Sequence, residues 1–157
     1  MANDQYQEFH LPIQAVWLTK RDIIELNVMV RKKFDPEATR KESVTVHVGL
    51  GERIVAITVP DSKRLRLGQW LRKHWTMTTA PTGTPQVRVF YDEPGRLVHL
   101  AFDDLELLDK EYVRRILRKG ELRFTADGEL CAIRIPVTTR RWRDGDLSAS
   151  AGYLPAR

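Results

Sequence analysis

The sequence predicts an α+β domain of three helix-plus-hairpin (α-β-β) units, with an antiparallel sheet, helices on one face and a flexible C-terminal tail. Three observations predict this fold. Three segments start with helix-capping residues and continue with apolar residues at helical spacing. Three pairs of apolar strand patterns accompany them, each pair joined by a glycine-containing turn. Finally, the units repeat with a period of about 43 residues, which is typical of internal repeats.

The first unit covers residues 19–59 and is predicted to begin with a helix. Thr19 and Asp22 form a start that resembles a capping box, and Pro36 stops the helix. Apolar residues in between recur at helical spacing, but they also alternate. Residues 20–33 are therefore predicted as a helix, with a strand as the alternative.

The other two units occupy residues 61–102 and 104–136, and each is predicted to begin with a helix. The second helix starts at Asp61 or Ser62, whose side chains are suited to cap a first turn. The third helix has the broadest apolar stripe of the three and stops at Gly120, a residue that commonly ends helices.

Paired strand patterns follow each predicted helix. They lie at residues 44–48 and 54–57, at 87–91 and 97–100, and at 122–124 and 130–133. Asp127-Gly128 joins the last pair and is a strong hairpin signal, because both turn positions favour a positive φ. Superposing residues 43–74 on 86–117 without gaps gives seven identical pairs, which supports the repeat.

Residues 1–136 are predicted to form a single domain, since 157 residues fit one compact unit. Residues 137–157 show no helical or strand period. They are predicted to be a tail that is either flexible or docks onto a partner through Trp142 and Tyr153.

The overall composition favours an intracellular protein with acidic partners. Lys and Arg number 26 against 21 Asp and Glu, which gives a net charge of +5. The sequence contains no run of about 18 apolar residues, so no membrane-spanning helix is predicted. The single cysteine, Cys131, and an N-terminus without signal-peptide features favour a cytoplasmic location.

The sequence predicts no catalytic residue, metal site or cofactor. The four histidines are scattered, and no CxxC or HxxxH spacing occurs. Phosphate-binding and hydrolase motifs such as GxxxxGK[ST], GxGxxG and GxSxG are also missing from the sequence.

Two basic stretches with interleaved aromatics are candidate nucleic-acid contacts, because such side chains suit phosphates and exposed bases. The candidates are Lys63, Arg64, Arg66, Trp70, Arg72 and Lys73, with Arg140, Arg141, Trp142 and Arg143 in the tail. The alternative interpretation is a solvated helix face whose tryptophans belong to the core.

Three functions remain open. The first is a non-catalytic binding or adaptor module that docks onto a protein partner, as the tail and the missing catalytic motifs indicate. The second is a nucleic-acid-binding accessory protein that uses residues 63–75 and the RRWR segment of the tail. The third is a small RNase or toxin, which needs no fixed motif.

Overall fold

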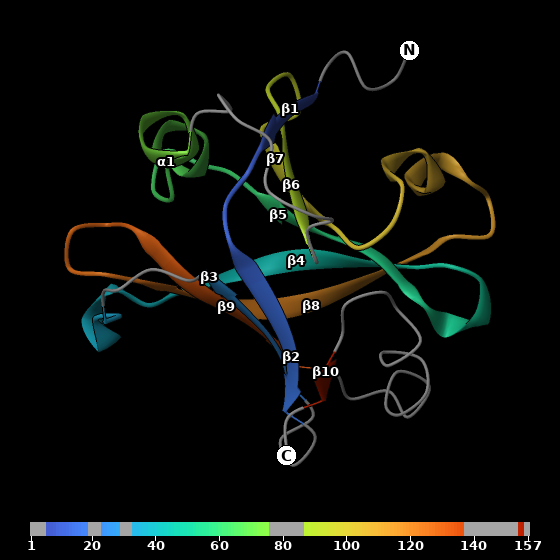
Figure 1. The fold of residues 1–157 in the computed structure, drawn as a ribbon, viewed down its shortest axis with the longest axis horizontal. Coiled ribbons are helices and arrows are strands. Elements are labelled where there is room, and N and C mark those ends of the chain that lie inside the picture. The colour runs from blue at the N-terminus through green and yellow to red at the C-terminus, as the bar shows by residue number, and fades with distance from the viewer. Residues whose placement is uncertain (1–5, 19–22, 29–32, 76–86, 137–153, 156–157) are drawn as a thin grey trace.

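The protein folds mainly as β-structure: one antiparallel sheet, curled into a half-barrel, with a single short helix in the described part of the chain (Figure 1). The computed structural model describes residues 6–18, 23–28, 33–75, 87–136 and 154–155. The predicted α+β fold of three helix–hairpin units is therefore wrong.

The sheet has the strand order β1-β6-β7-β5-β4-β8-β9-β3-β2-β10. The strands are β1 (Tyr6–Phe9), β2 (Ile13–Leu18), β3 (Ile23–Val28), β4 (Arg40–Val48), β5 (Ile54–Pro60), β6 (Arg88–Asp92), β7 (Leu97–Ala101), β8 (Arg114–Phe124), β9 (Leu130–Pro136) and β10 (Leu154–Pro155). The helix α1 spans Leu67–His74, and short 3-10 turns cover η2 (Pro36–Ala38), η3 (Leu50–Glu52) and η4 (Leu105–Asp109). All neighbouring strands are antiparallel except the two-residue β10, which runs parallel to β2.

The three predicted hairpins are confirmed, and they lie side by side in the centre of the sheet. β4 pairs with β5, β6 with β7 and β8 with β9, each in antiparallel register. The β8–β9 turn contains Gly128 at φ 86°, a conformation that glycine adopts without strain.

The first predicted helix is wrong over its described part. Ile23–Val28 is strand β3, in which Ile24, Leu26 and Val28 are buried while the residues between them are half-buried. The alternation of apolar residues, which left a strand as the alternative prediction, is therefore the correct signal. It favours a strand because β-branched residues pack well on a pleated surface.

The third predicted helix is also wrong. Asp104 does cap a first turn, because its side chain accepts a hydrogen bond from the Glu106 amide, but this turn is only the 3-10 segment η4. The chain then enters β8, in which Gly120 is buried in the middle of the strand. Leu117, expected in an apolar helix stripe, is 69% exposed on this strand. The expected layer of helices on one face does not form.

The curl of the sheet follows from the connection between β1 and β2. These strands lie at or beside opposite ends of the sheet, yet only three residues separate them. Four residue steps reach at most about 14 Å, so the two ends of the sheet must approach each other. At the β1 end of the sheet, the Glu8 carboxylate holds β1 against β6 by accepting hydrogen bonds of 2.9 and 2.8 Å from Arg88.

The core fills the inside of the curl, and α1 packs against it. Buried side chains from the strands meet Leu67, Trp70 and Leu71 of α1 in one continuous cluster. A smaller, separate cluster forms where Leu105 and Leu108 of η4 pack with alanines and a valine of β5 and β7.

Candidate functional site

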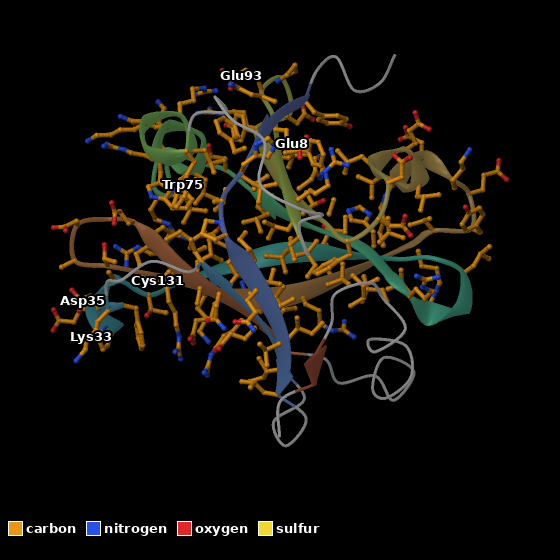
Figure 2. All side chains as sticks on the ribbon, viewed as in Figure 1. Glu8, Lys33, Asp35, Trp75, Glu93 and Cys131 are labelled. Atoms are coloured by element: carbon orange, nitrogen blue, oxygen red, sulfur yellow. The ribbon has the colours of Figure 1, made fainter. Side chains whose placement is uncertain are left out.

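The most distinctive polar surface surrounds α1 and the loop before it. It consists of Lys63, Arg64, Arg66, Arg72 and Lys73, which we call the α1 basic surface. All five side chains are exposed, and Figure 2 shows nitrogen-tipped side chains gathered around this helix. The structure therefore brings together the five predicted basic candidates of residues 63–75.

The orientation of α1 explains why these side chains face solvent. The helix buries Leu67, Trp70 and Leu71, whereas Gln69 and the two basic residues that follow Leu71 are exposed. Such a division follows from helical spacing, because residues three and four apart share one face.

The start of α1 is held by Asp61, although the helix begins six residues later. The Asp61 carboxylate accepts hydrogen bonds from the Leu67 amide at 2.7 Å and the Gly68 amide at 3.0 Å. A helix N-terminus leaves such amides without intrahelical partners, so this contact satisfies them. The predicted helix start at Asp61 or Ser62 is therefore wrong, although Asp61 does satisfy the first amides of α1 across the loop that precedes it.

Two hollows flank α1. The first, about 590 Å³, lies between the helix and the β8–β9 turn. The second, about 520 Å³, lies between the helix and the β6–β7 turn, whose residue Glu93 is labelled in Figure 2. Lys63, Arg66 and Gln69 line both hollows and so form a ridge between them.

Sequence reasoning missed three residues that line these hollows: Arg40, Gln69 and Arg96. Arg40 reaches the first hollow from β4, and Arg96 reaches the second from the β6–β7 turn. Strand pairing brings both arginines to the helix from distant parts of the sequence, so no local pattern could identify them. Gln69 lies within the basic stretch but is uncharged.

The ion pairs of the α1 basic surface divide its residues into two groups. Arg64 pairs with Glu42, and Arg72 pairs with Glu93. Lys63, Arg66 and Lys73 have no carboxylate partner among the described residues; the Arg66 side chain donates only to the Lys63 carbonyl, at 3.1 Å. These three cations are therefore the ones whose charge is free to attract an anion.

Acidic side chains bound the first hollow on the side opposite α1. Asp127 and Glu129 belong to the β8–β9 turn segment and line this hollow. Because like charges repel, they disfavour an anion at the hairpin wall and leave the helix wall as the attractive side.

Of the two tryptophans in residues 63–75, Trp70 belongs to the core and the half-buried Trp75 packs against it. Trp70 is 8% exposed and contacts Trp75 edge-to-face at 6.3 Å between ring centroids. Both indole N–H groups are buried with no hydrogen-bond partner in the described structure. Trp70 therefore does not present a face on which a base could stack, although its neighbouring cations are exposed.

A second polar cluster lies under β1 and is separate from the hollows. His47 on β4, Thr58 on β5 and His99 on β7 form a chain of hydrogen bonds of 2.9 and 2.7 Å through the threonine hydroxyl. Desolvation lowers the pKa of His47 to about 4 and also lowers the pKa of His99. Both rings are buried and line neither hollow, so they have no access to a substrate there.

Arg140, Arg141, Trp142, Arg143 and Tyr153 lie outside the described residues. Leu154 and Pro155 are described, and they pair with Val16 and Trp17 at the end of the sheet.

The described residues contain no group of three or more His, Cys, Asp or Glu side chains placed to hold a metal ion. In that same part of the chain, no helix has both the length and the apolar character needed to cross a membrane. Comparison with known proteins finds no matching family model, no matching curated sequence and no matching solved structure.

Proposed function

We propose that this protein is a non-catalytic module that binds nucleic acid through the α1 basic surface. One observation carries the proposal: Lys63, Arg66 and Lys73 line hollows beside α1 without a carboxylate partner among the described residues. Exposed cations without a carboxylate partner attract phosphates, and each phosphate contact releases bound counterions from the nucleic acid.

The burial of Trp70 supports a mode of binding that depends on charge. Single-strand binders usually combine a basic groove with exposed aromatic rings. Here the cations are exposed while Trp70 is 8% exposed, so phosphates are the part of a nucleic acid that this surface suits.

The test is a titration of fluorescent DNA and RNA oligonucleotides with the full chain at several salt concentrations. The binding constant of the wild type should fall steeply with salt. A Lys63→Gln, Arg66→Gln, Lys73→Gln variant should lower the slope of log K against log salt by about 2–3, since each lost phosphate contact removes 0.7–0.9.

The matched control is Arg53→Gln, Lys110→Gln, Lys119→Gln. It removes the same charge from exposed residues that line neither hollow. If this control lowers the slope as much as the site variant, net charge alone explains binding and the proposed site is wrong. Oligonucleotides should also stay intact after prolonged incubation; cleavage would instead favour the RNase alternative.

A protein partner is a second candidate, favoured by the strand pairing of Leu154–Pro155 with β2. This pairing shows that the edge of β2 accepts an extended segment, and an extended segment of a partner would bind there by displacing Leu154–Pro155. A Val16→Lys change puts a charge on this strand and should abolish capture of a protein partner, whereas Val16→Thr should preserve it. Equal capture by the two variants would contradict docking at this edge.

A further inference from the structure

The ridge between the two hollows is convex, and this shape limits the kinds of nucleic acid that can bind it. The α1 helix stands between them, and its exposed Gln69 lines both. Lys73 lies on the side of the first hollow, whereas Arg72 and Arg96 lie on the side of the second. Arg72 is paired with Glu93, so Lys73 on one side of the helix and Arg96 on the other are the cations available to phosphates there.

The lining of both hollows lacks an aromatic face for a base. The aromatic lining residues are Trp70 and Phe124 in the first hollow and Tyr91 in the second. They are 8%, 7% and 4% exposed. A single strand bound here would therefore lose the base stacking that such ligands normally gain.

The dimensions of α1 match a groove of a DNA duplex. The α1 helix spans eight residues, and an α-helix with its side chains is about 10–12 Å across. The major groove of B-form DNA is about 12 Å wide and admits an α-helix, with a phosphate strand on each side. The major groove of an RNA duplex is too deep and narrow for side chains to read.

We propose that the ligand is double-stranded DNA, with α1 facing the major groove, one phosphate strand beside each hollow and Gln69 directed at the base edges. This inference rests on the proposed nucleic-acid binding. Gln69 is uncharged and carries both a hydrogen-bond donor and an acceptor, the combination that pairs with adenine in the major groove. The surrounding cations position the helix, and Gln69 supplies the sequence preference.

The first experiment compares three competitors for the full chain at one salt concentration: a DNA duplex of about 16 base pairs, each of its single strands, and the RNA duplex of the same sequence. The DNA duplex should compete at least roughly tenfold better than the others. If a single strand or the RNA duplex competes equally well while the slope still depends on Lys63, Arg66 and Lys73, this inference is wrong and the proposed function stands. If none of them binds in a salt-dependent way, both are wrong.

The second experiment selects bound duplexes from a pool with randomised sequence. The wild type should enrich adenine at one position by roughly tenfold, the discrimination typical of a bidentate amide contact. Gln69→Ala should abolish this adenine enrichment and leave the slope of log K against log salt unchanged. The control Gln14→Ala, at an exposed position on β2, should preserve the enrichment. An enrichment that survives in Gln69→Ala would overturn the role of Gln69.

Discussion

The hydroxyl of Tyr91 donates a 2.7 Å hydrogen bond to Oδ2 of Asp61, the carboxylate that also caps α1. This contact joins strand β6 to the loop that carries Lys63 and Arg66. The position of the α1 basic surface therefore depends on a buried tyrosine in the sheet.

Tyr91→Phe should lower the free energy of unfolding by about 1.5–3 kcal/mol, the usual contribution of a hydrogen bond to a charged group. The change also leaves one Asp61 oxygen with fewer donors. Urea denaturation measures the loss, with Tyr112→Phe as the control because Tyr112 is 43% exposed. Equal stability of the two variants would show that the contact contributes nothing.

Wild-type stability should also decrease at alkaline pH through Tyr91. Burial, followed by the hydrogen bond to Asp61, raises the pKa of Tyr91 from 10 to about 12. The folded state thus holds its proton more tightly than the unfolded state, so this stabilisation is present below pH 10 and is lost as pH rises towards 12. The difference between the denaturation midpoints of wild type and Tyr91→Phe should be smaller above pH 10 than at pH 8. An equal difference at both pH values would contradict the assignment to Tyr91.

Gly68→Ala should destabilise the protein by about 1–3 kcal/mol, although alanine is the better helix former. A Cβ at position 68 would lie 2.6 Å from Cζ of the Tyr91 ring, too close for any side chain. Thermal unfolding of Gly68→Ala and of Gln69→Ala, an exposed position in the same helix, measures the effect. Stability of Gly68→Ala above that of the wild type would mean that the ring moves aside without strain.

The histidine cluster should make the fold sensitive to mild acid. Desolvation, nearby His99 and Arg115 lower the pKa of His47 to about 4, and desolvation lowers that of His99 despite the opposing effect of Asp92. In the unfolded chain both histidines take up a proton near pH 6.5. The folded state binds fewer protons, so stability is fully present above pH 6.5 and falls as pH drops towards 4.

His47→Gln should reduce this acid sensitivity, measured as the change in urea midpoint between pH 7 and pH 4.5. The ring of Tyr6 on β1 packs edge-on against His99 at 5.4 Å, so β1 should become more accessible to hydrogen exchange in acid. His10→Gln is the control, because His10 is half-buried and takes no part in the hydrogen bonds that join His47, Thr58 and His99. An unchanged pH dependence in His47→Gln would assign the effect to other groups.

Asp127→Asn should tighten nucleic-acid binding by about two- to fivefold at low salt, because it removes a repulsive charge from the first hollow. The gain should shrink at high salt, where exposed charges are screened. Asp109→Asn, at an exposed position in η4, removes the same charge elsewhere and is the control. Weaker binding by Asp127→Asn would show that this carboxylate supports the site instead.

The sequence predicted local structure better than long-range structure. The β8–β9 hairpin could be predicted because Asp127-Gly128 specifies its turn through its own backbone preferences. Residues 23–28 fit helical and strand periods alike, and pairing with the distant β9 decided in favour of a strand. Residues 114–119 were predicted as the end of a helix, and pairing with the distant β4 makes them a strand instead. Propensity is a weak signal where such pairing is available.

The candidate site shows the same division. Lys63, Arg66 and Lys73 are close in sequence, so a basic stretch could reveal them. Arg40 and Arg96 join them only because β4 and the β6–β7 turn lie beside α1. The burial of Trp70 also required the structure, because an aromatic on a short helix fits the core and an exposed face equally well.

The short link between β1 and β2 has a consequence for how the chain is made. β1 pairs with β6. β3 pairs with β2 on one side, but its neighbour on the other side is β9. Both neighbours leave the ribosome long after residues 6–28, since β9 ends at Pro136. β1 and one edge of β3 therefore stay unpaired while the intervening chain is made, and the nascent chain must keep these apolar segments from aggregating until β6 and β9 have been synthesised.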